Sequence, residues 1–197
     1  MGELLAPLVL FALAVTLTPG PNVVLVTAAA ANFGFRRTLP QMIGISLAFG
    51  LMTLMAGLGL VSVIHAAPRL HALLKYAGAA YLLYLAWRIA RTETAGANPA
   101  RGRPIHFLEA ALFTWLNPKA WVSTLGAVAA FTTVDGDMVW ESAAIALVLA
   151  AACLLSCVIW AGFGAAIGRF LARPRARLSF NYAMAGLLAL SFVPVLS

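Results

Sequence analysis

The sequence is poor in charged residues and contains very little cysteine. Of its 197 residues, only 10% are charged and two are cysteines, whereas 63% are hydrophobic. A soluble domain of this size has about a quarter of its residues charged and about half of them apolar. The mean hydropathy of +0.96 therefore excludes an ordinary soluble domain and predicts an integral membrane protein.

Acidic residues are scarcer than basic ones. Six Asp and Glu stand against 13 Lys and Arg, so the formal net charge is +7. A basic excess can indicate binding to nucleic acid, but here the basic residues lie in short loops between apolar runs. This placement is typical of membrane proteins. We therefore expect this chain to be surrounded by membrane lipid and not to bind nucleic acid.

The motifs of metal, redox and nucleotide sites are also missing. There is no Cys-x-x-Cys, no His-rich cluster and no Gly-x-x-x-x-Gly-Lys-Ser/Thr. Cys153 and Cys157 lie four residues apart in one apolar run, on one face of a predicted helix, and are interpreted as small buried residues. We expect no metal, no cofactor, no ATP hydrolysis and no enzymatic activity.

Six apolar runs are each long enough, or nearly so, to cross a bilayer as a helix, which takes about 20 residues. They are approximately residues 4–31, 39–64, 70–87, 107–134, 142–168 and 178–197. The first run starts without Lys or Arg, so it is interpreted as a retained span and not as a signal peptide. The polar segment 91–104 is predicted to be a linker between the first three runs and the last three.

The two sets of three runs have the same order. Each set begins with a long run interrupted by proline, continues with a long uncharged run and ends with a shorter one. Because three is odd, the second set must enter the membrane from the opposite side. The predicted fold is all-α: one transmembrane domain, 1–197, with six helices in two inverted three-helix repeats. The repeats are residues 1–90 and 105–197, and helices 1 and 4 are broken.

The loop charges predict an orientation for the six spans. Loops one, three and five and their edges are rich in arginine: Arg36, Arg37, Arg88, Arg91, Arg101, Arg103, Arg169, Arg173, Arg175 and Arg177. Loop two has Arg69 and Lys75 around it, and loop four carries Asp135, Asp137 and Glu141. Lys and Arg favour the cytoplasmic side. We therefore expect loops one, three and five, including the linker, to be cytoplasmic and both termini to lie outside.

The prolines interrupt two spans at corresponding places, in TPGPN (18–22) and in LNPKAW (116–121). Irregular backbone at membrane depth persists only where it is buried in protein or lines a wet cavity, and paired breaks indicate a transport site. Freed N–H groups suit a carboxylate and freed carbonyls an ammonium. The predicted substrate-binding residues are Thr18, Pro19, Gly20, Pro21, Asn22, Asn117, Pro118 and Lys119. Simple proline kinks are the alternative.

Lys119 is an ionisable residue about twelve positions into the fourth run, near the middle of the membrane. Such a group costs several kcal/mol unless it is paired or hydrated, so it is a functional candidate. It could bind a substrate carboxylate or titrate during transport, and a lysine that reaches toward the interface is the alternative. Glu109, near the start of the same run, is expected to be interfacial.

Small residues and tryptophans are weaker signals. Gly164 and Gly168 are four residues apart, a spacing that permits close packing of helices. Four tryptophans of the second half could line a pathway or anchor helices at interfaces, and the sequence does not separate these roles: Trp115, Trp121, Trp140 and Trp160.

The sequence resembles the lysine exporter and homoserine/threonine resistance family of bacterial amino-acid exporters. The resemblance lies in TPGPN (18–22), NFGFRRTLPQMIGISLAFG (32–50), LLKYAGAAYLLYLAW (73–87) and LNPKAW (116–121). It implies an inner-membrane exporter of amino acids or their derivatives, driven by the proton gradient. Residues 19–22 match the first family motif, and residues 117–119 match the second.

Two other functions are alternatives to export. A membrane thiol or electron carrier with a similar layout would need a cysteine beside a proline in each half, whereas both cysteines lie in the fifth run. A non-transporting scaffold would have little use for Lys119 or for two matched breaks. The sequence leaves open which amino acid is exported, which ion drives export, and whether the chain forms a homo-oligomer.

Overall fold

The structure, a computed structural model, describes residues 4–60, 76, 80–81, 83–91, 103–133, 136–171 and 174–190. Within these residues the chain forms helices and connecting segments and no strand. The helices are α1 (Leu5–Leu17), α2 (Pro21–Phe33), α3 (Phe35–Met55), η1 (Ala56–Leu60), α6 (Phe107–Leu116), α7 (Pro118–Phe131), α8 (Met138–Phe170) and α9 (Pro174–Leu190), and residues 83–90 are helical as well. The predicted all-α class is confirmed for this described part of the chain.

The first predicted span consists of two helices, α1 and α2, bent by 59° at a short break. Thr18 and Gly20 have extended backbone, with ψ of 125° and −176°. Pro21 then begins α2, where a missing N–H has no cost because the first N–H groups of a helix have no partner in that helix. The predicted break is confirmed, and it covers residues 18–20.

The fourth predicted span is interrupted at one residue. α6 ends at Leu116, Asn117 is extended with φ −85° and ψ 111°, and Pro118 begins α7. The side-chain oxygen of Asn117 accepts a hydrogen bond from the backbone N–H of Lys119 at 3.1 Å. Asn117 therefore ends one helix and caps the next, as asparagine commonly does at the start of a helix.

Two of the described helices are long and apolar enough to cross a membrane, Phe35–Gly59 and Met138–Phe170, and the bent pair α1 and α2 adds a third if it is one span. α8 begins at Met138, before the predicted residue 142. The reason is Asp137, whose carboxylate accepts hydrogen bonds from Val139 N and Trp140 N at 2.9 and 3.0 Å. These lengths and compositions agree with an integral membrane protein.

Several predicted segments are only partly described. Most of the third span (70–87), most of the linker (91–104) and the end of the sixth span after Leu190 lie outside the described residues. α9 begins at Pro174, earlier than the predicted residue 178, and proline fits the first turn of a helix. The total of six spans therefore stays a prediction.

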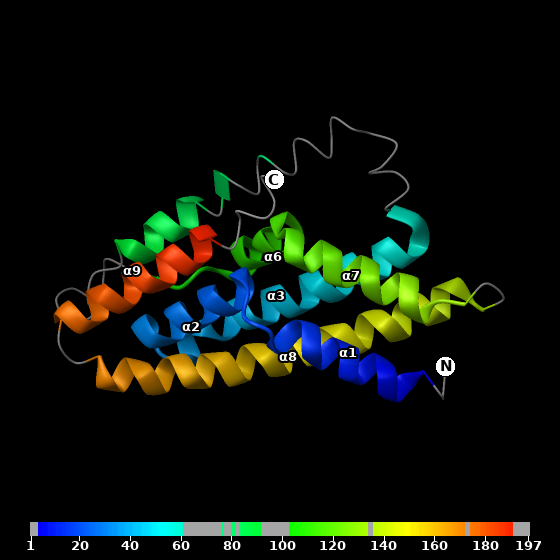
Figure 1. Ribbon diagram of the computed structural model, residues 1–197, viewed down its shortest axis with the longest axis horizontal. Coiled ribbons are helices and arrows are strands. Elements are labelled where there is room, and N and C mark those ends of the chain that lie inside the picture. The colour runs from blue at the N-terminus through cyan, green and yellow to red at the C-terminus, as the bar shows by residue number, and fades with distance from the viewer. Residues whose placement is uncertain are drawn as a thin grey trace.

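The described helices run back and forth along the long axis of the molecule (Figure 1). α1 and α2 lead from the right end to the left end, and α3 returns to the right. In the second half the directions are opposite: α6 and α7 lead to the right, α8 returns to the left, and α9 turns back again. The α1–α2 break lies near the middle of this axis (Figure 1).

α2 packs closely against α8 through glycines. A Cβ atom on Gly164 would collide with the carbonyl oxygen of Thr27, and one on Gly168 would collide with that of Ala31. The α2 residues from Val23 to Asn32 are all buried, and many of them are small. The close packing predicted from Gly164 and Gly168 is confirmed, and it holds α8 alongside the broken helix.

Candidate transport site

A cavity of about 50 Å³ lies where the α1–α2 break meets the start of α7 and the middle of α8, and this is room for a few water molecules. It is lined by Val15, Thr16, Thr18, Gly20, Pro21, Asn22, Val23, Phe49, Asn117, Lys119, Ala120, Ser123, Cys153, Ser156 and Cys157. Six of the eight predicted site residues are in this lining, and Pro19 and Pro118 are not. The two breaks thus contribute to one cavity.

Lys119 connects the two breaks. Its Nζ donates a hydrogen bond to the carbonyl oxygen of Thr18 at 2.6 Å, and its backbone N–H is capped by Asn117. Its stem lies against Gly20, because a Cβ there would be 2.7 Å from Lys119 Cδ and 3.0 Å from Nζ. Within the described residues, the ion pairs all involve Glu109 and none involves Lys119. The charge is thus held by a backbone carbonyl, and it points to the break.

The carbonyls freed at the end of α1 are satisfied by side chains. Ser156 Oγ donates to Thr16 O at 2.7 Å, and Trp160 Nε1 donates to Leu17 O at 3.2 Å. Thr18 Oγ1 donates to Ala14 O, four residues earlier, at 2.6 Å. The Ser156 and Trp160 bonds replace those that a continuous helix would supply, whereas Ala14 O also keeps its backbone bond from Thr18 N at 3.3 Å. They assign Trp160 to the break, a role that the sequence left open.

The beginning of α2 is less well satisfied than the end of α1. No side chain caps α2, and Pro21 supplies no N–H. The side-chain oxygen of Asn22 is buried and has no hydrogen-bond partner among the described residues. An uncapped helix start favours an anion, and a buried oxygen without a partner favours a donor. The cavity therefore has an uncapped helix start and an unpaired hydrogen-bond acceptor in its lining.

The remainder of the lining includes apolar and weakly polar residues. It contains Val15 of α1, Phe49 of α3, and Cys153 and Cys157 of α8. Both cysteines are free and buried. Among the described residues of the lining, none is acidic. The lining thus combines one cationic side chain with neutral groups.

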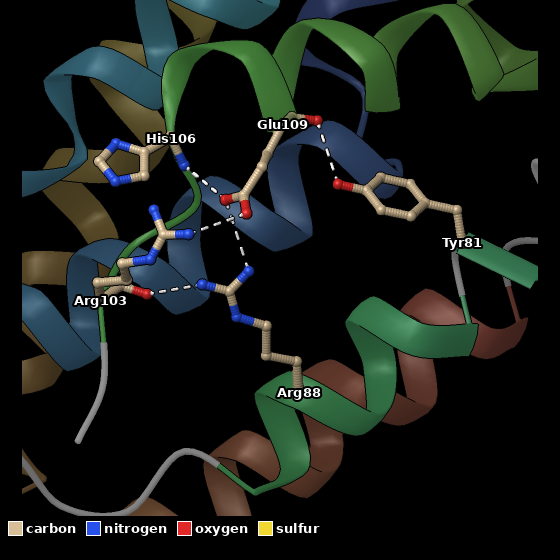
Figure 2. A network of polar contacts seen from close by, with 5 residues as sticks. All are labelled: Tyr81, Arg88, Arg103, His106 and Glu109. Atoms are coloured by element: carbon tan, nitrogen blue, oxygen red, sulfur yellow. Dashed lines mark hydrogen bonds and ion pairs between the residues drawn. The ribbon is translucent and has the colours of Figure 1, made fainter.

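Glu109 belongs to a separate network, which Figure 2 shows. Its carboxylate accepts from His106 N at 2.9 Å, closing the first turn of α6, and pairs with Arg88 at 3.5 Å and Arg103 at 3.3 Å. The Tyr81 hydroxyl donates to Glu109 O at 3.4 Å. These groups join the helix at 83–90 to the start of α6 and are not part of the cavity lining. Glu109 therefore fits a structural role, in which it links these segments. Its partly exposed ion pairs contribute about 0–1 kcal/mol to folding stability.

Sequence reasoning missed the contributions of α3 and α8 to the cavity. Ser156 and Trp160 lie four residues apart, so they are on one face of α8 and meet successive carbonyls of the break. A serine one turn before a tryptophan in an apolar run was the available signal. Phe49 and the two cysteines carried none, because apolar residues at helical spacing also occur throughout a core.

The chain is similar to a known family and to proteins of described function. The family model described as LysE type translocator matches residues 13–195. The cysteine/O-acetylserine efflux protein of Salmonella typhimurium (strain LT2) is 37% identical over 123 residues, which is 61% of this chain and 62% of the relative. The chain thus matches less than two thirds of the length of that relative.

Two other relatives match over longer stretches. The cysteine/O-acetylserine efflux protein of Klebsiella pneumoniae is 30% identical over 159 residues, 80% of each chain. The protein of the same description from Escherichia coli (strain K12) is 30% identical over 152 residues, 77% of each chain. No solved structure matches this chain.

Proposed function

The chain belongs to the LysE type translocator family, and on this premise we propose that it exports a small neutral amino acid across the bacterial inner membrane. Its relatives are described as efflux proteins for cysteine and O-acetylserine. Both are small amino acids whose side chains carry no positive charge. A translocator moves a solute and does not transform it, so membership of this family confirms the prediction that the chain is not an enzyme.

The observation that carries the proposal is the hydrogen bond from Lys119 Nζ to Thr18 O inside a cavity formed by two helix breaks. A half-buried cation held by a neutral carbonyl can exchange that partner for a carboxylate, since bonds between two charged groups are the stronger ones. The uncapped start of α2 adds favourable potential for the same anion. These groups support a binding place for the α-carboxylate of an amino acid.

The α-ammonium group has acceptors in the same cavity. Asn22 Oδ1 is buried without a partner, and Thr18 O becomes available once Lys119 turns to the carboxylate. Substrate binding would thus exchange one internal hydrogen bond for a set of contacts to both charges of the zwitterion. The proposal pairs each charged end of the substrate with groups of opposite polarity.

The side chain of the substrate would then face Phe49, Cys153 and Cys157. This wall is small and apolar and, among the described residues, offers no carboxylate to a second positive charge. A cationic side chain would be desolvated here without a partner, which is costly. We therefore propose small neutral amino acids as substrates and expect lysine to be exported poorly.

The proposed coupling ion is the proton, and Lys119 is the residue proposed to respond to it. It is the one described residue of the lining that carries a formal charge at neutral pH. Its two possible roles, binding the carboxylate and titrating, are distinguished by the variants Lys119→Ala and Lys119→Arg. We infer no cofactor, and formation of a homo-oligomer stays open.

The proposed arrangement is six spans in two inverted repeats, residues 1–90 and 105–197 joined by the cytoplasmic linker 91–104, with both termini periplasmic. The opposite directions of α1–α2 and α6–α7 in Figure 1 support it. The ends of α2 and α8 and the starts of α3 and α9, which carry Arg36, Arg37, Arg169 and Arg175, lie at one end, while the end of α7 and the start of α8 lie at the other (Figure 1).

Export can be tested in a bacterium that lacks its own amino-acid exporters. Cells expressing the chain are preloaded with labelled cysteine, O-acetylserine, threonine or lysine, and efflux is followed. We expect efflux of small neutral amino acids to exceed that of lysine, and resistance to their toxic analogues. Export of none of them by a protein present at normal abundance in the membrane would refute the proposal.

A further inference from the structure

The two cysteines of the chain are both in the wall of the cavity. They are the whole cysteine content of the sequence, and both are buried and free of disulfide bonds. They lie one turn apart on α8 and line the cavity together with Ser156. Residues four apart are neighbours on one face of a helix, with Cβ atoms about 5–6 Å apart, so the two thiols lie close together. The cavity wall therefore contains a pair of adjacent thiols.

The helix geometry does not favour a disulfide between these residues. Side chains four residues apart on a helix have Cβ atoms about 5–6 Å apart, whereas a disulfide requires about 3.5–4.5 Å. A direct bond between the sulfurs would distort α8 at the point where it supports the break. One atom inserted between the two sulfurs lengthens the bridge and leaves the helix intact.

We propose that Cys153 and Cys157 form a dithiol site that binds a trivalent organoarsenical of the type R–As(OH)₂, and that the bound group blocks the cavity. Each thiol replaces one hydroxide on arsenic, so two As–O and two S–H bonds break and two As–S bonds form. The two hydroxides leave with the two thiol protons as two water molecules. Arsenic stays trivalent, so no oxidant or reductant is needed.

The surroundings favour this class of ligand over a metal ion. Structural zinc takes four ligands, and the described residues contain no group of three His, Cys, Asp or Glu side chains that could hold a metal. An arsenic atom that already carries one organic group needs only two thiols, which is the number present. The reagent is uncharged, as is the wall formed by Phe49 and the cysteines.

Two sulfurs on one helix also bind more firmly than two separate thiols. After the first As–S bond forms, the second thiol is already in place, so ring closure has a high effective concentration. The cavity of about 50 Å³ has little space for such a group and a substrate together. Blocking of export rests on the proposed function, whereas binding does not.

Binding is measured directly on the purified full-length protein with methylarsonous acid, CH₃As(OH)₂, followed by intact-mass spectrometry. We expect one arsenical per chain, retained in excess 2-mercaptoethanol and released by 2,3-dimercaptopropanol. In Cys153→Ala and Cys157→Ala the adduct should be lost in 2-mercaptoethanol, with retention falling at least about tenfold. Absence of an adduct on the unmodified protein, or equal retention by the single-cysteine variants, would overturn the proposal.

Export is measured in parallel in preloaded cells, and each variant is compared with its own untreated rate. The arsenical should slow efflux by the unmodified protein about tenfold or more and change that of either variant less than about twofold. Binding without inhibition would overturn the claim that the bound group blocks transport. If untreated cells show no efflux at all, the proposed function fails, and the mass measurement still decides whether the dithiol site exists.

Discussion

Lys119 is the residue on which the proposed mechanism depends, because its Nζ bonds to Thr18 O while its backbone N–H is capped by Asn117. Hydrogen bonds to charged groups contribute about 1.5–3 kcal/mol, which corresponds to roughly a 10- to 100-fold change in rate. We expect Lys119→Ala to lower export by at least this factor while the protein still reaches the membrane. The measurement that checks this expectation is efflux from preloaded cells, normalised to the abundance of the protein in the membrane.

The variant Lys119→Arg separates the two roles of this residue. Arginine keeps the positive charge and resists deprotonation. Partial export by Lys119→Arg would indicate that the residue holds the carboxylate, whereas complete loss would indicate that it must titrate. Normal export by Lys119→Ala would remove the residue from the mechanism.

Gly20 provides the space that the lysine side chain occupies. A Cβ at this position would lie 2.7 Å from Lys119 Cδ, so Gly20→Ala should push the side chain away from Thr18 O. Such overpacking costs about 1–3 kcal/mol, and we expect export to fall roughly tenfold. The matched control is Gly126→Ala on α7, where the nearest atom would be 3.6 Å away. Equal export by the two variants would contradict this account.

At the scale of the elements, α8 supplies the hydrogen bonds that end α1. Removing the Ser156 hydroxyl would leave Thr16 O without the donor that it now has at 2.7 Å. A buried group that loses its partner costs about 1–3 kcal/mol. We expect Ser156→Ala to lower the unfolding temperature of the detergent-solubilised protein and to reduce export.

The matched control for Ser156 is Ser46→Ala on α3. That hydroxyl is also buried, but it donates to Met42 O within its own helix at 2.9 Å. Removing it leaves the helix hydrogen bonds in place, so its effect on the unfolding temperature should be the smaller one. A larger effect of Ser46→Ala would show that the break does not depend on α8.

At the scale of the whole molecule, the directions of the helices predict which loops face the cytoplasm. We expect reporter fusions at residues 36, 97 and 174 to be cytoplasmic and a fusion at 136 to be periplasmic, because the arginine-rich loops stay inside. Alkaline phosphatase, active outside the cytoplasm, and a fluorescent protein, active inside, give opposite readouts. A periplasmic signal at 174 or a cytoplasmic one at 136 would contradict the inverted repeat.

The features that the sequence predicted correctly depend on the chemistry of single residues and their chain neighbours. Pro21 and Pro118 begin helices in the structure because proline lacks an N–H, and the break at residues 18–20 follows from this. The cavity lining from α3 and α8 could not be predicted, since it depends on how these helices are rotated and how closely they pack. Ser156 reaches the break because the contacts of Gly164 and Gly168 bring α8 close to α2.

The bond between Lys119 and Thr18 joins the second half of the chain to the first. In the proposed binding mode this hydrogen bond breaks when the substrate carboxylate binds Lys119. The protein without substrate therefore stays closed. An exporter of this kind would show no uncoupled flux: protons and metabolites could not cross the membrane through it while no substrate is bound. A cell could then keep it in the membrane continuously without draining its gradient.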